Sequence, residues 1–158
     1  METNIRFAAE VDIETLISLR FDYFANEKHK ITAETRAFME TNLRQYFAEH
    51  INRDFFAAIV EADEKIVATA FLAVSAKPAN LSFPTGKTGT ILNVLTYPEH
   101  RRKGYAESSL KLFLEEARRQ NLSYIELSAS EMGKPLYQKL GFREKVPSDF
   151  TEMRLSLL

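Results

Sequence analysis

The sequence predicts a mixed α/β (α+β) fold: a mainly antiparallel sheet of about seven strands with helices on both faces. Two β-type apolar runs, 55–60 and 65–75, are joined by a tight turn at 62–64 and therefore predict an antiparallel hairpin. A further apolar run, 90–96, is linked to the next, 124–129, through an amphipathic helical segment. Strands joined through a helix usually run parallel, so we expect this pair to be the parallel part of the sheet.

The other elements follow from hydrophobic periodicity and from capping residues. Apolar residues at helical spacing predict two early helices, with Asp12 and Thr32 as their N-caps. A short last helix should hold Pro135 in its first turn and end at Gly141. The expected strands are 4–8, 55–60, 65–75, 90–96, 124–129, 142–146 and 151–157, and the expected helices are 13–25, 33–51, 105–119 and 135–140.

Composition limits the class of protein. The 158 residues are 45% hydrophobic and 27% charged, so we expect one globular domain over residues 1–158. A net charge of −1 supplies no field for nucleic acid, and no apolar run is long enough to cross a membrane. The absence of cysteine excludes disulfides and thiolate metal sites and favours a cytoplasmic protein. The three histidines are scattered, so no metal site is expected.

A basic turn links the strand 90–96 to the helix that begins at Tyr105. It carries three basic residues, 101–103, followed by Gly104. Helix N-termini present backbone N–H groups and the positive end of the helix dipole, and glycine allows an anion to approach closely. The turn therefore predicts a phosphate-binding site, although the glycine patterns of the P-loop and the dinucleotide fold are absent. The alternative is a solvated basic turn that caps the helix.

This turn resembles a known motif. Arg101-x-x-Gly104-x-Ala106 is similar to the [QR]-x-x-G-x-[GA] pattern of the GNAT superfamily of N-acetyltransferases. The segment Leu136-Tyr137-Gln138-Lys139-Leu140-Gly141-Phe142 resembles the L-Y-x-K-x-G-F signature of the same family. The order of the elements also resembles the GNAT fold, so the resemblance covers nearly the whole chain. It implies that the fourth and fifth strands are parallel and splay apart.

The resemblance implies acetyl-coenzyme A as the co-substrate and no metal. In the family, the pantetheine arm pairs with the backbone of the fourth strand, and the pyrophosphate binds at the turn and the helix N-terminus. On matched positions, the coenzyme-binding residues are Val94, Leu95, Thr96, Arg101, Arg102, Lys103, Gly104, Tyr105, Ala106 and Glu107.

Two catalytic residues are implied by the same resemblance. Tyr137 matches the family tyrosine that acts as general acid on the departing thiolate, and a phenol is protonated at neutral pH. The alternative is a core aromatic on a short helix. Glu126 lies where some family members place a glutamate that acts as general base on the amine, and the alternative is an outward-facing charge on a strand. Asn93, on the opposite face of its strand from Val94, either binds substrate or satisfies a polar spot.

The expected function is transfer of an acetyl group, by direct attack, to a primary amine of an unidentified small molecule or peptide. Residues 23–30 are acceptor-side candidates, because the first helices often wall that site in the family. One alternative is another acyl donor or an oxygen nucleophile, and another is a non-catalytic acyl-coenzyme A sensor. Nucleic-acid binding is disfavoured, because the basic segment 101–103 is short and lacks interleaved aromatics. A homodimer formed through the final strand or the helices is left open.

Overall fold

The computed structural model describes residues 2–158. They group into two units, Met1–Ser128 and Ala129–Leu158. The first unit holds, in chain order, β1 (Thr3–Phe7), the 3-10 helix η1 (Glu10–Asp12), α1 (Ile13–Asn26), α2 (Ala33–His50), β2 (Phe55–Ala62), β3 (Lys65–Ala76), β4 (Lys87–Thr96), the 3-10 helix η2 (Pro98–His100), α3 (Tyr105–Arg119) and β5 (Ile125–Glu126). The second unit holds α4 (Lys134–Lys139).

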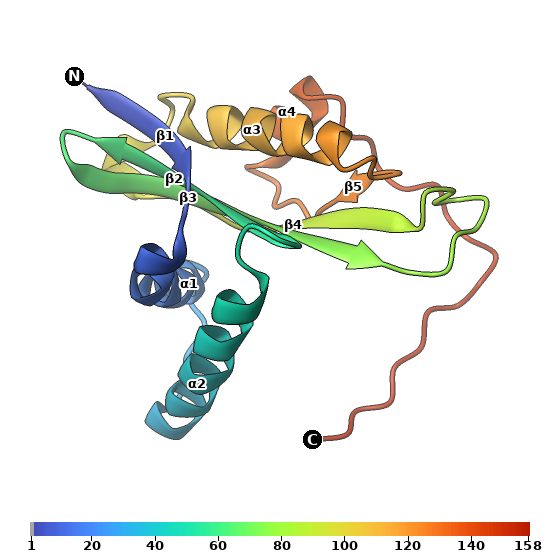
Figure 1. The fold of residues 1–158 in the computed structure, drawn as a ribbon, viewed down its shortest axis with the longest axis horizontal. Coiled ribbons are helices and arrows are strands. Elements are labelled where there is room, and N and C mark those ends of the chain that lie inside the picture. The colour runs from blue at the N-terminus through green and yellow to red at the C-terminus, as the bar shows by residue number, and fades with distance from the viewer. Residues whose placement is uncertain (1) are drawn as a thin grey trace. The chain divides into compact units, whose positions relative to one another are not determined.

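A five-stranded sheet organises the first unit, in the order β1-β2-β3-β4-β5. The pairs β1–β2, β2–β3 and β3–β4 are antiparallel, whereas the pair β4–β5 is parallel. In Figure 1, α3 crosses one face of this sheet, and α1 and α2 lie on the other face. The predicted mainly antiparallel sheet, its parallel pair and the helices on both faces are therefore confirmed, as is the hairpin of β2 and β3.

The expected count of about seven strands is wrong, because the sheet has five. Segments 142–146 and 151–157, expected as the last two strands, form no ladder in the described part of the chain. Their apolar side chains stay in solvent: Val146, Met153 and Leu155 are 88%, 91% and 83% exposed. Alternating apolar and polar residues favour an extended backbone, but a strand also needs a partner segment for its hydrogen bonds.

Apolar side chains from the helices bury both faces of the sheet. On the face covered by α1 and α2, Leu16 and Phe47 are fully buried together with Phe55 and Phe71 of the strands. The rings of Phe47, Phe55 and Phe71 have centroids 5.0 to 5.9 Å apart. On the α3 side, Phe113 is fully buried. Burial of each such side chain contributes about 1.5–3 kcal/mol, so packing on the sheet holds the helices in place.

The helices α1 and α2 begin where the capping residues predict, but the two caps differ. The Thr32 hydroxyl accepts a hydrogen bond from the backbone N–H of Thr35 at 3.1 Å, which confirms the cap of α2. Asp12 precedes α1 without capping it. Its carboxylate instead accepts from the backbone N–H of Ala9 at 2.8 Å and from Arg6 at 2.8 and 3.1 Å. An arginine on β1 therefore redirects a residue whose sequence context predicts a cap.

Candidate active site

The strand β4 contains a bulge at its centre. Asn93 and Val94 together lie opposite the single residue Ala70 of β3, because the register shifts between the flanking pairs. Asn93 adopts a left-handed backbone with φ of +54°, a conformation that asparagine tolerates better than most residues. A bulge leaves a residue out of the ladder and turns its backbone groups toward a new direction. The middle of β4 can therefore offer main-chain donors to a ligand.

The parallel strands β4 and β5 are paired over a very short length. Their register joins Gly89 with Ile125 and Thr90 with Glu126, and β4 then continues to Thr96 without a ladder to β5. The predicted splay of these strands is confirmed. On the side away from β3, this length of β4 forms no ladder with any strand of residues 2–158, and such a strand edge presents backbone N–H and C=O groups that an extended ligand can pair with. Val94, Leu95 and Thr96 belong to this length of β4.

The helix α3 begins at a glycine that leaves its N-terminus open. Gly104 is the N-cap and has φ of +81°, a left-handed backbone that favours glycine. A Cβ atom built at Gly104 would meet nothing within 4 Å, so the side of the backbone next to the helix end is open. No side chain caps α3, and the first helical hydrogen bond joins the N–H of Ser108 to the carbonyl of Gly104. This geometry suits an anion held by the first-turn N–H groups.

The three basic residues of the turn have different roles. The Arg101 guanidinium donates to the Thr96 carbonyl at 3.1 Å and to the Asn26 side chain at 3.0 Å. It therefore ties the turn to the ends of β4 and α1. Arg102 and Lys103 are exposed, so they supply the solvent-facing positive charge of the turn. On the same helix, Glu107 pairs with Lys111 at 2.9 Å, as their i,i+4 spacing predicts. Tyr105 is buried against the sheet, and Ala106 follows it in the first turn of α3.

Asn93 connects the bulge to helix α1. The Asn93 side chain is 2% exposed and donates to the Leu19 carbonyl at 3.4 Å. Its oxygen accepts a hydrogen bond from the Arg20 guanidinium at 3.2 Å, and that guanidinium lies 4.6 Å from the centroid of the Phe24 ring. Arg20 is the residue of this region that the sequence analysis missed. A signal was present, because Arg20 stands four residues from Leu16 and from Phe24, on an apolar helical stripe.

Glu126 occupies the last paired position of β5, opposite Thr90. Its side chain is half-buried. Along β4, Thr90 precedes Val94 by four residues, which corresponds to about 13 Å of strand. Glu126 therefore marks the start of the opening between the two strands, and its role as a base stays a prediction.

Tyr137 lies in the second unit, on the short helix α4. It is 9% exposed, and its ring packs against Phe142 with the centroids 6.0 Å apart. The predicted helix, with Pro135 in its first turn and Gly141 after its end, is confirmed. The burial of Tyr137 fits both a core aromatic and a residue held in place for catalysis, so its role as general acid stays a prediction.

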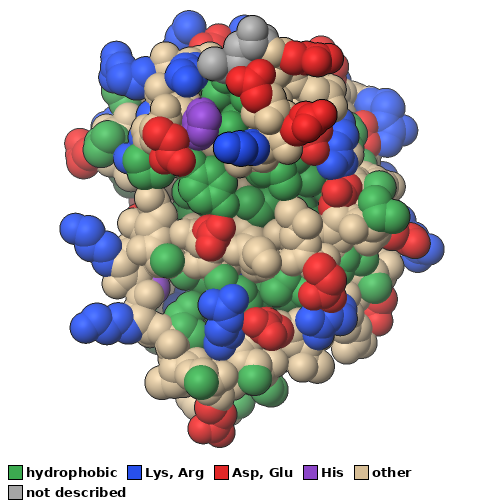
Figure 2. Space-filling view, turned by 90° about the vertical axis from the view of Figure 1, so that its left-hand side faces the viewer, with side chains coloured by type: hydrophobic (Ala, Val, Ile, Leu, Met, Phe, Trp, Pro, Cys, Tyr) green, Lys and Arg blue, Asp and Glu red, His purple; other side chains and the backbone are tan. Residues whose placement is uncertain are grey.

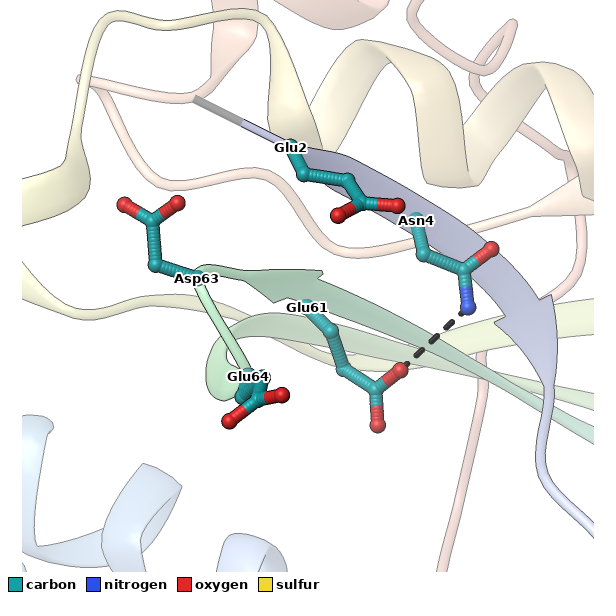
Figure 3. Close-up of a pocket in the computed structure, with 5 residues that line it drawn as sticks. All are labelled: Glu2, Asn4, Glu61, Asp63 and Glu64. Atoms are coloured by element: carbon teal, nitrogen blue, oxygen red, sulfur yellow. Dashed lines mark hydrogen bonds between the residues drawn. The ribbon is translucent and has the colours of Figure 1, made fainter.

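The first unit also has a surface cavity beside the β2–β3 turn. This cavity of about 530 Å³ is lined by Glu2, Asn4, Glu61, Asp63 and Glu64 (Figure 3). Asn4 donates to the Glu61 carboxylate at 3.3 Å. Within residues 2–158, no group of three or more His, Cys, Asp or Glu side chains is placed to hold a metal ion. The acidic lining therefore provides no metal centre.

The surface charges and the histidines add no further site. On the face drawn in Figure 2, Lys and Arg side chains are interspersed with Asp and Glu, with apolar side chains between them. This face lacks the continuous basic stripe of a nucleic-acid interface.

Of the three histidines, His50 has a carboxylate neighbour: its Nδ1 lies 2.7 Å from an oxygen of Asp54. Among the described helices, none is both long and apolar enough to cross a membrane.

Comparison with known structures finds close relatives of this fold. A predicted acetyltransferase from Clostridium acetobutylicum, solved with acetyl-CoA, is 30% identical, with a TM-score of 0.83 over 97% of this chain and 96% of the other. A GCN5-related N-acetyltransferase from Ralstonia eutropha JMP134 is 24% identical, with a TM-score of 0.77 over 98% and 99%. Glucosamine-6-phosphate N-acetyltransferase from Arabidopsis thaliana is 19% identical, with a TM-score of 0.67 over 98% and 100%, and shares the fold. No curated protein matches the chain.

Comparison with protein families gives one assignment. The model of the acetyltransferase (GNAT) family matches residues 14–142, which include the bulged strand β4, the basic turn, α3 and α4. This agrees with the two motifs and with the splayed pair of strands. The chain belongs to the GNAT family of acetyltransferases.

Proposed function

We propose that this protein is an N-acetyltransferase that moves the acetyl group of acetyl-coenzyme A to a primary amine of a small molecule or peptide. One observation carries the proposal: β4 leaves its ladder with β5 after Thr90, bulges at Asn93 and leads through a basic turn to the open end of α3. An extended edge and an anion site thus follow one another along the chain. Acetyl-coenzyme A has the matching parts, an amide-containing arm and a pyrophosphate.

The residues of the first unit fit the coenzyme. Val94, Leu95 and Thr96 offer the unpaired edge of β4 to the pantetheine arm. Gly104 leaves open space beside the first turn of α3 for the pyrophosphate, and the small side chain of Ala106 keeps that turn uncrowded. Arg102 and Lys103 add positive charge, whereas Arg101 is proposed to act mainly by holding the turn. In the Clostridium acetobutylicum relative, acetyl-CoA is part of the solved structure.

The chemistry then needs a proton acceptor, an oxyanion donor and a proton donor. Acetyl-coenzyme A supplies the thioester. The amine nitrogen forms a bond to the acetyl carbon while the carbon–sulfur bond breaks, so the amine loses one proton and the thiolate gains one. We propose that Glu126 accepts the proton that the amine loses, and that the hydroxyl of Tyr137 donates the proton that the thiolate gains. Backbone N–H groups at the bulge, around Val94, are the proposed donors to the developing oxyanion.

We also propose that the chain forms one functional domain and acts in the cytoplasm. The family match at 14–142 includes residues of both units, which supports one functional domain. The cysteine-free composition supports a cytoplasmic location. Solved proteins of this fold include enzymes named for glucosamine 6-phosphate and for aminoglycosides, so amines of small molecules are the first acceptors to test.

Thermal melting with and without acetyl-coenzyme A tests the binding step. A ligand at a hundredfold its Kd stabilises the folded state by about 2.7 kcal/mol, which raises the melting temperature by several degrees. Gly104→Val should abolish most of that rise, because a β-branched residue does not adopt the left-handed backbone. The exposed Glu99→Gln, in the same turn, is the matched control and should keep the rise. Absence of a rise in the wild-type protein contradicts the assignment.

A thiol-release assay against a panel of amines tests the reaction itself. Release of coenzyme A in proportion to acetylated amine supports the transferase. A melting rise without thiol release for any amine, oxygen nucleophile or alternative acyl donor favours the non-catalytic sensor instead.

A further inference from the structure

Arg20 differs from the other arginines of the first two helices. Arg36 pairs with Glu40 at 3.0 Å, and Arg44 pairs with Glu14 at 2.6 Å. For Arg20, the structure of residues 2–158 gives no carboxylate within ion-pair distance. Arg20 is nevertheless half-buried, whereas charged side chains that leave water normally gain an opposite charge.

Asp22, the acidic residue of α1 nearest to Arg20 in sequence, is hydrogen-bonded to another residue. Asp22 accepts a hydrogen bond from the Tyr97 hydroxyl at 2.5 Å. Burial and this bond raise the pKa of Tyr97 above its ordinary value, so the phenol keeps its proton and donates a hydrogen bond to Asp22. For Arg20, burial lowers the pKa of the guanidinium, and the neighbouring Tyr23 opposes this shift. A guanidinium stays charged at neutral pH, so Arg20 is a positive charge without a counter-ion.

The surroundings of Arg20 hold it in a defined orientation. One nitrogen donates to the Asn93 oxygen at 3.2 Å, and the plane of the group lies over the Phe24 ring at 4.6 Å. These neutral contacts use one of the five N–H donors and leave the positive charge uncompensated. A fixed guanidinium with spare parallel donors is suited to the two oxygens of a carboxylate or phosphate.

The position of Arg20 relates it to the proposed reaction. Asn93 is the bulge residue of β4 and directly precedes Val94, where the acetyl group is proposed to lie. The helix α1 packs on β4, so the guanidinium stands one hydrogen bond from the strand that would hold the thioester. An acceptor with its amine at the bulge and an anionic group a short distance away would bring that group to Arg20.

We propose that Arg20 binds an anionic group, a carboxylate or a phosphate, on the acceptor, so that the preferred substrates are small amines that carry such a group. This inference rests on the proposed acetyltransferase function. The competing role for Arg20 is purely structural: it would hold Asn93 and thereby the bulge. The two roles differ in what a substitution changes, because a structural role affects every amine equally and an anion site affects only charged acceptors.

Matched amines separate these roles. The probes are two pairs, glycine with glycinamide and phosphoethanolamine with ethanolamine, each assayed by thiol release and by melting in the presence of coenzyme A. In at least one pair, the anionic member should have a KM about tenfold lower than the neutral member in the thiol-release assay. It should also raise the melting temperature of the wild-type protein at a concentration about tenfold lower. A preference for glycine over glycinamide indicates a carboxylate on the acceptor, and a preference for phosphoethanolamine over ethanolamine indicates a phosphate.

Variants then attribute the preference to Arg20. Arg20→Gln should raise the KM for the anionic amine about tenfold more than the KM for its neutral partner, and Arg20→Lys should restore part of that difference. Arg36→Gln is the matched control, because its guanidinium also lies over an aromatic ring, that of Phe21 at 4.2 Å, but is paired with Glu40. This control should keep the preference.

Three results would overturn the inference. They are equal response of the wild-type protein to both members of each pair, a preference for the neutral members, and an equal loss for charged and neutral amines in Arg20→Gln. The melting rise with acetyl-coenzyme A is recorded for every variant. If it is absent in the wild-type protein, the proposed function fails; if it is present and no charge preference is found, only the role of Arg20 fails.

Discussion

The backbone N–H of Phe142 donates to the carbonyl of Tyr137 at 3.0 Å, and the two rings pack with their centroids 6.0 Å apart and an angle of 69° between them. Gly141, which directly precedes Phe142 in sequence, has φ of +99°, and its backbone N–H donates to the Gln138 carbonyl at 3.0 Å. These two bonds and the ring contact are those of a Schellman helix end. The L-Y-x-K-x-G-F segment is thus a compact device that ends α4 and fixes the ring of Tyr137.

Replacement of Gly141 should loosen this helix end. In Gly141→Ala, the left-handed backbone costs about 1–2 kcal/mol, so the amides of Gly141 and Phe142 should exchange hydrogen about tenfold faster. Gln138→Ala, at an exposed position of α4, is the control and should leave exchange at these amides nearly unchanged. Equal protection in Gly141→Ala and wild type would contradict the role of this glycine.

Loss of the Tyr137 hydroxyl should affect turnover rather than binding. Tyr137→Phe keeps the ring packed on Phe142 but removes the proposed proton donor, so kcat should fall about 100-fold or more. The melting rise with acetyl-coenzyme A should stay within about 1 °C of wild type, since the proposed coenzyme-binding residues are on β4, the turn and α3. An unchanged kcat would show that Tyr137 is a core aromatic and not the acid.

Substitution of Glu126 tests the base. Glu126→Gln preserves size and removes the carboxylate at the last pair of β5, so kcat/KM should fall about 100-fold across the pH range if this group takes the amine proton. Glu115→Gln, an exposed glutamate on α3, is the control. A pH–rate profile identical to wild type in Glu126→Gln would exclude the assignment and leave water as the acceptor of the proton.

Acid should weaken the fold through Asp12. Hydrogen bonds from Arg6 hold the pKa of the Asp12 carboxyl below its ordinary value of 3.8. A lowered folded-state pKa means that the stabilisation is complete above the unfolded value and disappears as the pH falls through the folded value. Asp12→Asn should therefore lower the free energy of unfolding by about 2 kcal/mol at pH 7, and by progressively less as the pH falls below 3.8 and through the lower folded-state pKa.

Denaturant titrations at several pH values measure this effect. Glu10→Gln, at an exposed position nearby, should give a curve parallel to that of wild type. A constant difference between Asp12→Asn and wild type from pH 7 to pH 2 would contradict the coupling to Arg6.

We propose that the exposed apolar residues near the end of this sequence form the contact of a homodimer. Phe150, Met153, Leu155 and Leu157 are each more than 80% exposed, and Met153, Leu155 and Leu157 alternate with polar residues as in a half-buried strand. A second copy of the chain could cover them. Light scattering should then give twice the mass of one chain. Leu155→Asp combined with Leu157→Asp should give one chain's mass, and the control Val11→Asp, at an exposed apolar residue of the first unit, should stay dimeric. A monomeric wild-type protein would refute the dimer.

Much of the fold could be predicted from local pattern. The apolar stripe of α1, the continuous apolar runs of β2 and β3, and the glycines at 104 and 141 each express a local preference of the backbone. The structure places helices, hairpin and turn where these preferences indicate. The proposed coenzyme-binding segment rests on the same kind of local pattern, because its residues are nearly consecutive in the chain.

The sequence by itself determined the order of the elements as far as α4, the hairpin and the two motifs, since these depend on neighbours within a few residues, and it indicated the parallel pair through the helix that joins the two strands. Only the tertiary structure decided the strand count, the bulge at Asn93 and the unpaired charge of Arg20. A strand exists only when a distant segment accepts its hydrogen bonds, and residues 142–158 have none in the described chain. Likewise, whether an arginine has a counter-ion depends on which side chains the fold brings beside it, and Arg20 meets Asn93 from 73 residues away.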